Sequence, residues 1–571
     1  MKNKTIHTSL HIQLFTLRIL TLALVTLCLC TLNLNAQAPT VGLLQYDSQG
    51  HQDGYVLFAP LYSNTTYLID KCGKQVHTWE STTKPGLSAY LLNDGSLLRP
   101  GSVNNPTFIL GGGSGGLIEK ISWDGTILWS YQISDTMICQ HHDIKPMPNG
   151  NVLAIVWKSK TYKETVDLGR DTAKTNDICW FESIVEIAPT GLNTGEIVWE
   201  WNSYDHLVQS YDSTKSNFGV ISDKPERINI NYGLNFKIAD WLHVNSVDYN
   251  PELDQILVSA YKFDEVWIID HSTTTKQAAT NSGGKYGKGG DLLYRWGNPE
   301  SYNRGTPADR KLFGQHSARW IERGLVDSGK ILVFNNGSRG SATYSSVDII
   351  NPPIDQNGMY PLEKGKPFAP VEQDWIYTDS VRGDFFSPNY SAAQRLPNGN
   401  TLICSGFNGL IFEITPDNKK VWGYKNPVSI SGIAKQGDNV SANSVYRAEF
   451  YPSDFSGFSE RMLESGNPIE LNPGISICEP NSIDVSPNDI ADYKIYPNPA
   501  NQILSINLGS NAKNINQIVL VNALGVKVGS SEIQTDNNFY TIDLQNIPSG
   551  VYALKVISDF SDFTEKVLII K

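Results

Sequence analysis

A strand–turn–strand unit that ends in tryptophan recurs six times along this chain, and this repeat limits the folds open to it. The clearest copies are residues 68–79, 121–129 and 412–422, and looser copies end at Trp199, Trp296 and Trp375. A unit repeated in this way is typical of propellers and arrays, in which neighbouring repeats bury each other's apolar faces. The repeat therefore points to an all-β architecture.

A second unit lies between these copies and supplies hairpin turns. Residues 93–98, 148–153 and 397–402 each place Asp-Gly or Asn-Gly between two apolar runs. Such pairs provide the positive φ angles that tight hairpins need. Two hairpins per repeat make a four-stranded sheet, so we predict a six-bladed β-propeller over residues 41–476. We expect residues 55–60 to add the outer strand that the last repeat lacks. Two stacked β-sandwiches are the alternative.

The pattern changes after residue 476. Residues 477–493 form a polar linker, and short alternating strands follow at 503–508, 518–521, 539–544, 551–557 and 566–570. We therefore predict that residues 494–571 form a small C-terminal β-sandwich.

The N-terminus and the composition indicate where the protein is located and which partners it can bind. Residues 1–36 combine positive charge, a short apolar run and small residues near its end, which predicts a removable signal peptide. No other segment is apolar enough to span a membrane. The net charge of −12 argues against a nucleic-acid partner. Five cysteines follow the signal peptide without the spacing of a zinc site, and we expect Cys139 to pair with Cys179.

The positions of the histidines are the sequence feature that indicates a functional site. The chain has ten histidines, of which two lie in the predicted signal peptide. Four of the others, His141, His142, His243 and His316, fall where the second unit of a repeat begins. In a propeller these positions meet at one end of the central channel, so we predict a functional cluster there.

Clustered imidazoles suit two kinds of site. They bind transition metals, but no acidic ligand has a clear place beside them here, so we expect no metal. They also act as nucleophile and as proton donor, because the histidine pKa lies near neutrality. We expect no cofactor. Gly111-Gly-Gly-Ser-Gly-Gly116 precedes a predicted strand rather than a helix, which argues against a dinucleotide site.

Several local strings resemble the active-site segments of bacterial aryl-sulfate sulfotransferases. They are Gln140-His-His-Asp143, Trp241-Leu-His-Val-Asn-Ser246, Gly314-Gln-His-Ser-Ala318 and the trailing Val333-Phe-Asn-Asn-Gly337. The resemblance covers about residues 50–450. It implies a propeller that moves a sulfuryl group from a phenolic sulfate ester to a phenolic acceptor through a covalent sulfohistidine, by ping-pong kinetics and without a nucleotide donor. Separately, Tyr496-Pro-Asn-Pro499 and Ile547-Pro-Ser-Gly-Val-Tyr552 resemble the C-terminal sorting domain of the type IX secretion system. That implies delivery to the cell surface or secretion by that machinery.

The resemblance assigns roles residue by residue. It implies His316 as the nucleophile, His243 as a second catalytic histidine with Asn245 beside it, and either His141 or His142 as the proton donor. Tyr261 stands where the family has an arginine that binds sulfate, and a tyrosine cannot replace its bidentate donors. Lys262 follows it, but on a strand it should point to the opposite face.

Three tyrosines are predicted to form the walls of the substrate-binding site. Tyr90, Tyr390 and Tyr446 lie at the same repeat positions and are expected to flank a phenol. The Tyr261 departure favours a second hypothesis, a cell-surface propeller that binds sulfated or anionic ligands without chemistry. The oligomeric state does not follow from the sequence.

Overall fold

The computed structural model describes residues 38–571 except 109–111, 114, 234–236, 340–341, 460, 475–476, 479–493, 509–514, 523–526, 532–538 and 559–562. The chain forms two compact units, Met1–Ser476 and Ile477–Lys571. The predicted signal peptide, and all of the predicted linker but Ile477 and Cys478, lie outside the described residues. Among the helices that the structure describes, none is long and apolar enough to cross a membrane.

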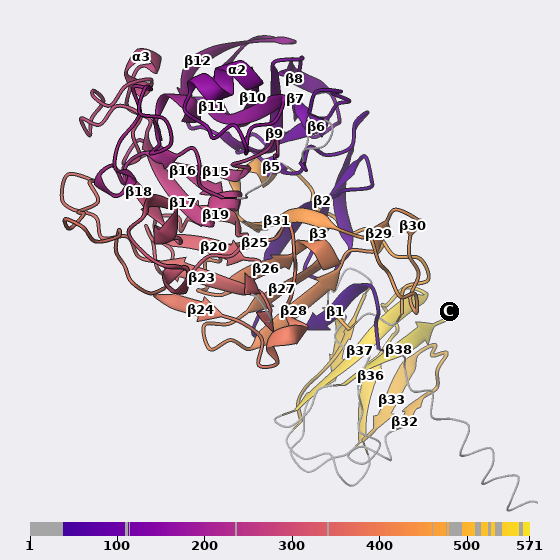
Figure 1. Cartoon of the computed structure of the whole chain (residues 1–571). Helices are drawn as coiled ribbons and strands as arrows, with labels where there is room; N and C mark the ends of the chain where they lie inside the picture. The colour runs from indigo at the N-terminus through magenta and orange to yellow at the C-terminus, as the bar shows by residue number, and fades with distance from the viewer. Residues whose placement is uncertain are drawn as a thin grey trace, which may run out of the picture. The chain divides into compact units, whose positions relative to one another are not determined.

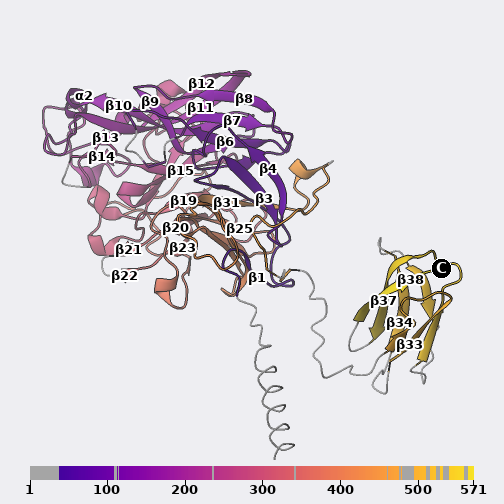
Figure 2. The same ribbon diagram turned by 90° about the vertical axis from the view of Figure 1, so that its right-hand side faces the viewer.

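The regular secondary structure of the first unit is almost entirely antiparallel sheet (Figure 1). In its described part, six sheets have four or five strands, in the orders β31-β2-β3-β4, β5-β6-β7-β8, β9-β10-β11-β12, β15-β16-β17-β18, β19-β20-β23-β24 and β25-β26-β27-β28-β1. In Figures 1 and 2 the first strands β15, β19, β25 and β31 gather toward the middle of this unit. β15 contacts both β9 and β19, and β25 contacts β31.

The strands of these six sheets have the following bounds. They are β1 (Gly42–Tyr46), β2 (Gly54–Pro60), β3 (Thr65–Asp70), β4 (Gln75–Glu80), β5 (Tyr90–Leu91), β6 (Leu97–Ser102), β7 (Gly116–Ile121), β8 (Ile127–Gln132), β9 (Ile138–Pro146), β10 (Val152–Thr161), β11 (Ile178–Gly191), β12 (Thr194–Asn202), β15 (Val244–Asn250), β16 (Gln255–Ala260), β17 (Glu265–Asp270), β18 (Tyr294–Trp296), β19 (His316–Trp320), β20 (Ile331–Asn335), β23 (Ser346–Ile350), β24 (Trp375–Tyr377), β25 (Ala392–Arg395), β26 (Thr401–Ser405), β27 (Leu410–Ile414), β28 (Lys420–Lys425) and β31 (Val445–Pro452). Two short helices, α2 (Tyr162–Asp167) and α3 (Thr275–Ala278), begin at Thr161 and Thr274 with capping boxes that satisfy their first N–H groups.

The six repeated tryptophans all lie on the fourth strands of these sheets, namely β4, β8, β12, β18, β24 and β28. Several donate their indole N–H to the next sheet along the chain. Nε1 of Trp79 lies 3.1 Å from the carbonyl oxygen of Ser122, and Nε1 of Trp129 lies 2.9 Å from that of Thr194. Nε1 of Trp422 on the last sheet lies 2.6 Å from the carbonyl oxygen of Lys71 on the first. The tryptophan pattern therefore marks the contacts between sheets.

The predicted hairpin turns are present. Gly95, Gly150 and Gly399 have φ angles of 77°, 86° and 87°, and they connect β5 to β6, β9 to β10 and β25 to β26. Only glycine adopts these angles without steric cost, which explains why the motif is constant in the sequence.

The two ends of the first unit pair with each other's sheets, but not as predicted. Residues 55–60 lie in β2, which pairs with β31 and β3 inside the first sheet. The added outer strand of the last sheet is β1, which pairs with β28. The prediction that residues 55–60 complete the last sheet is wrong, because the last strand of this unit crosses to the first sheet instead.

The second unit contains two antiparallel sheets, β32-β33-β36 and β35-β34-β37-β38. Their bounds are β32 (Lys494–Tyr496), β33 (Ile503–Asn507), β34 (Ile515–Val521), β35 (Lys527–Ser531), β36 (Phe539–Asp543), β37 (Gly550–Ser558) and β38 (Phe563–Ile569). Leu504 and Ile542 from one sheet and Leu520 and Leu554 from the other share one buried core. The alternating pattern seen in the sequence provides those inward-facing side chains.

The expected Cys139–Cys179 disulfide is wrong. Both cysteines are free and buried, as is Cys404. Cys139 lies on β9 and Cys179 on β11, and β10 runs between them. Two inter-strand spacings, about 9–10 Å, exceed the reach of a disulfide.

Candidate active site

Four residues within or just before the first strands of their sheets have an unusual backbone conformation. His142, His243, Ser317 and Tyr390 have φ angles of 52°, 58°, 53° and 60°. The strand pairing is irregular beside the first three of them. Such left-handed residues and bulges re-aim side chains out of the regular strand alternation, and they concentrate at functional sites.

This geometry brings three predicted histidines from three sheets into one cluster. The ring centroids of His142 and His243 are 4.5 Å apart. The ring of Tyr261 lies between those of His243 and His316, with ring centroids 5.2 Å from His243 and 5.4 Å from His316. Residues about 175 positions apart in sequence therefore form a continuous series of rings, which we call the histidine cluster.

His316 is held by two acceptors on one side of its ring. Nδ1 lies 2.8 Å from Oδ1 of Asn336 and 3.2 Å from the carbonyl oxygen of Gly314. Asn336 gives its own amide hydrogens to the carbonyl oxygens of Ser387 and Tyr390, at 2.7 and 3.0 Å, so its oxygen must face the histidine. Nδ1 therefore carries the proton, and the neutral ring has its lone pair on Nε2. Burial lowers the pKa of His316 to about 3, which keeps the ring uncharged.

His243 has a carboxylate partner instead. Its Nδ1 bonds to Oδ2 of Asp240, and Nζ of Lys262 lies 3.6 Å from the same carboxylate oxygen. Burial raises the pKa of Asp240, but His243 and Lys262 outweigh it and lower that pKa below its usual value. An ionised Asp240 accepts from Nδ1 of His243 and so fixes the orientation of that ring.

His141 and His142 differ in which of their ring nitrogens have hydrogen-bond partners. Nε2 of His141 lies 2.9 Å from Oε2 of Glu182, Nδ1 lies 2.8 Å from Nδ1 of His142, and the ring stacks on Trp157. Both ring nitrogens of His141 therefore have hydrogen-bond partners within the protein. His142 faces His243, and burial together with His243 and His141 lowers the pKa of His142 well below its usual value.

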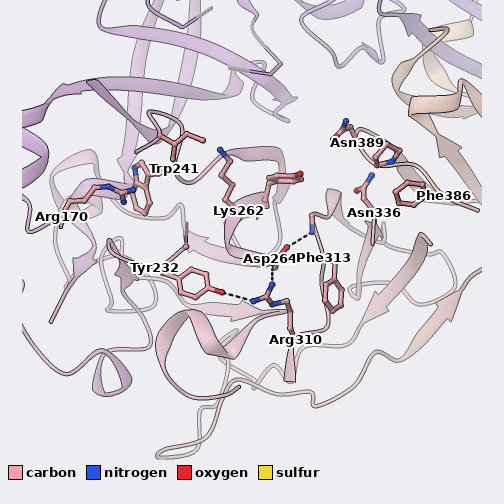
Figure 3. Close-up of a pocket in the computed structure, with 15 residues that line it drawn as sticks. Arg170, Tyr232, Trp241, Lys262, Asp264, Arg310, Phe313, Asn336, Phe386 and Asn389 are labelled. Carbon is pink, nitrogen blue, oxygen red and sulfur yellow. Dashed lines mark hydrogen bonds and ion pairs between the residues drawn. The ribbon is translucent and has the colours of Figure 1, made fainter. Parts of the chain in front are cut away.

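A cavity of about 580 Å³ opens beside the histidine cluster (Figure 3). Tyr261, Gly314 and Asn336 belong to its lining, so both residues that hydrogen-bond to His316 form part of its wall. Lys262 also lines it, contrary to the expectation that it faces away from Tyr261. Residues 261–263 form a 3₁₀ turn rather than a strand, so the two side chains do not alternate between faces.

The other predicted contacts lie away from this cavity. Asn245 donates to the carbonyl oxygen of Gln315 at 2.8 Å, and its buried Oδ1 has no partner in the described part of the chain. That free atom is an acceptor, so it cannot bind a sulfuryl oxygen. The expected tyrosine walls are not in the cavity lining either.

Two of those tyrosines belong to a buried charged network. Tyr90 donates to Asp143 at 3.1 Å and accepts from Arg447 at 2.6 Å, and Tyr446 donates to the backbone oxygen of Asn245. Tyr390 is half-buried, with its ring 6.4 Å from that of Tyr446. The aromatic wall comes instead from Tyr232, Trp241, Phe313 and Phe386, together with Tyr261.

Three residues that orient the histidines were not singled out from the sequence. Asn336 lies in the segment 333–337 that was noted for its resemblance, and Asp240 precedes His243 by three positions. Glu182 accepts from His141, and its other oxygen accepts the indole N–H of Trp157 and the backbone N–H of Val244. It lies on the third strand of its sheet, where no repeat position marked it. Within the described part of the chain, no group of three histidine, cysteine or acidic side chains is arranged to hold a metal ion.

Residues 64–450 match the family model described as Arylsulfotransferase (ASST), and residues 494–571 match the model described as Secretion system C-terminal sorting domain. No curated protein matches the chain. Among similar solved structures is a protein of unknown function from Bacteroides caccae, with 13% identity and a TM-score of 0.38, covering 70% of this chain and 98% of that chain. A virginiamycin B lyase from Staphylococcus aureus has 11% identity and a TM-score of 0.32, covering 69% of this chain and 86% of that chain. The β-propeller domain of Cps50 (Swd1) from Myceliophteria thermophila has 10% identity and a TM-score of 0.33, covering 68% and 87%.

Proposed function

The chain belongs to the arylsulfotransferase family, and we propose that it moves a sulfuryl group from an aryl sulfate to a phenolic acceptor through a sulfohistidine at His316. The observation that carries this proposal is the fixed tautomer of His316. Asn336 and Gly314 both accept from Nδ1, so Nε2 is an unprotonated nucleophile. The low pKa of His316, about 3, keeps that nucleophile available across the physiological pH range.

In the first half-reaction, Nε2 of His316 attacks the sulfur of the donor and the bond from sulfur to the aryl oxygen breaks. The departing oxygen takes a proton from His243, whose ring Asp240 orients. The sulfonated ring keeps its Nδ1 proton and becomes cationic, and the oxygens of Asn336 and Gly314 stabilise that N–H group.

In the second half-reaction, the acceptor phenol gives its proton to His243. Its oxygen then attacks sulfur, and the bond from sulfur to Nε2 breaks. The products are a new aryl sulfate, a neutral His316 and a protonated His243, as at the start. Because donor and acceptor use the site in turn, ping-pong kinetics follow.

The contacts favour catalytic roles for the histidines that differ from those the resemblance implied. His141 has both nitrogens occupied, so we assign it to positioning His142 rather than to proton donation. His142 stays uncharged next to His243, and His243 has the carboxylate partner, so we assign the proton-donor role to His243. Lys262 supplies positive charge near the position of the missing arginine.

We also propose the wider organisation. The six large sheets of the first unit act as the six blades of a propeller, with the histidine cluster at one end of its channel. The two sheets of the second unit pack as a sandwich. The sorting domain indicates export to the cell surface or secretion, through the type IX machinery, after residues 1–36 have acted as a signal peptide.

The test is an assay with 4-nitrophenyl sulfate as donor, with and without a phenolic acceptor. Acceptor-dependent release of 4-nitrophenol together with a sulfated acceptor supports the proposal. Saturable binding of the aryl sulfate without any release would instead support the non-catalytic binding protein that Tyr261 in place of arginine favours.

A further inference from the structure

Arg170 is a buried cation in the wall of the cavity, and it has no carboxylate partner. Its side chain is 2% exposed, and it donates from Nη1 to the carbonyl oxygen of Ile230 at 2.6 Å and from Nε to that of Lys174 at 3.4 Å. Its guanidinium lies 5.0 Å from the ring centroid of Trp241. Nη2 has no hydrogen-bond partner within the described part of the chain. Burial lowers the pKa of Arg170, although Cys179 and Asp171 act in the opposite direction.

The other charges of the cavity wall are already balanced. Arg310 lies 3.1 Å from Asp264, which is the one carboxylate among the described lining residues, and 2.9 Å from Glu300. Lys262 lies beside Asp240. The carboxylate nearest to Arg170 in sequence, Asp171, accepts from the backbone N–H of Ala173 instead.

A buried charge without a partner costs free energy, and proteins rarely retain one without a reason. A guanidinium with free donors is well suited to bind a carboxylate or sulfate. The unpaired Arg170 therefore indicates that the cavity receives an anionic group at this point.

The position of Arg170 sets where that group lies on the substrate. Figure 3 shows Arg170 and Asn336 on opposite sides of the cavity, with Lys262 between them. Asn336 marks the end at which His316 reacts. Trp241, Tyr232 and Phe386 also line the cavity and suit an aromatic ring.

We propose that the cavity takes phenolic substrates that carry a second anionic group remote from the reacting oxygen, and that Arg170 binds this group. The inference rests on the proposed sulfuryl transfer for the orientation of the substrate. Arg170 is a specificity residue in this scheme, because it does not touch the reacting atoms.

The test uses the full chain, 4-nitrophenyl sulfate as a constant donor, and two acceptors of the same length. These are 3-(4-hydroxyphenyl)propanoate and its neutral primary amide, which differ only in charge. We expect the KM of the acid to be about tenfold lower than that of the amide, the usual effect of one charge-assisted contact. Arg170→Gln removes this preference by raising the KM of the acid more than that of the amide, and Arg170→Lys retains part of it. Arg323→Gln, at an exposed arginine outside this cavity, leaves the preference unchanged.

Equal KM values for acid and amide in the wild-type protein would overturn the inference even if sulfuryl transfer is active, and this comparison needs no variant that has to fold. If no transfer occurs with either acceptor, calorimetry with the same pair decides. Tighter binding of the acid, lost in Arg170→Gln, supports the anion site while the proposed function fails. Equal binding, or a preference that survives in Arg170→Gln, refutes the anion site.

Discussion

Nδ1 of His316 lies 2.8 Å from Oδ1 of Asn336, and the amide of Asn336 is itself fixed by two backbone carbonyls. This contact determines which nitrogen of the histidine carries the proton. The chemistry proposed for the site depends on it, and so do the first two predictions.

His316→Asn should abolish both the covalent intermediate and sulfuryl transfer, because an amide cannot attack sulfur. Intact-protein mass spectrometry after adding donor without acceptor should show one sulfuryl group on the wild-type protein and none on the variant. His51→Asn, which changes a histidine outside the cluster, is the matched control and should form the adduct normally. Wild-type turnover in His316→Asn would show that the nucleophile assignment is wrong.

Asn336→Leu should lower kcat about 100-fold while the protein stays folded, since the ring of His316 loses the acceptor that orients it. Asn336→Asp restores an acceptor and should recover part of the rate. It should also raise the pKa of His316, because a carboxylate favours the charged ring, and the rate should then fall at acidic pH. Rates measured from pH 5 to pH 8 on both variants check this. An unchanged rate in Asn336→Leu would remove the tautomer argument.

His243→Asn should affect donors according to how much their leaving group needs a proton. Phenyl sulfate, with a weakly acidic phenol, should lose about 100-fold or more in adduct formation. 4-Nitrophenyl sulfate, whose leaving group is stable as an anion, should lose much less. Pre-steady-state adduct formation with both donors measures the ratio. An equal loss for both donors contradicts proton donation by His243.

Tyr261→Arg should raise kcat/KM for sulfuryl transfer about tenfold, because a guanidinium between His243 and His316 offers two donors to the sulfuryl oxygens. Tyr261→Phe is the control. The Tyr261 hydroxyl has no hydrogen-bond partner within the described part of the chain, so its removal should change the rate little. Steady-state kinetics on the three proteins suffice. A slower Tyr261→Arg enzyme that remains folded would show that the site is built around the tyrosine.

His271 lies outside the active site, and it should make the stability of the folded protein depend on pH. It lies 2.7 Å from Asp254 and 3.0 Å from Glu186, and these carboxylates raise its pKa to about 9 despite its burial. A raised histidine pKa means that the folded state binds the proton more tightly, so the stabilisation is complete below about pH 6.5 and is lost as pH rises through 9. We expect the free energy of unfolding to fall by up to about 3 kcal/mol over this interval.

Chemical denaturation at pH 6.5 and pH 9.5 measures this change. His271→Gln should be less stable at pH 6.5 and should lose most of the pH dependence. His51→Gln should keep it. A flat profile in the wild-type protein would contradict the ion-pair argument.

Local patterns identified the strands and the histidines. The Asn-Gly and Asp-Gly turns and the repeated tryptophans predicted the hairpins and the strand–turn–strand units, because these features depend on backbone sterics and on contacts that recur in every repeat. The same periodicity placed His141 or His142, His243 and His316 at corresponding repeat positions, which predicted a histidine cluster without deciding between His141 and His142. Alternation in the C-terminal segment likewise located five of its strands.

The sequence by itself thus determined the all-β class, the repeat and the residues with catalytic potential. Only the tertiary structure decided their partners. Asn336 and Asp240 orient two histidines, Lys262 turns into the cavity, and Arg170 is left as an unpaired cation in its wall. The physical reason is that hydrogen-bond direction, burial and charge balance depend on side chains from several sheets at once. Strand periodicity fixes only which face of its own sheet a residue occupies. A 3₁₀ turn at residues 261–263, which that periodicity does not encode, was enough to reverse the predicted direction of a side chain.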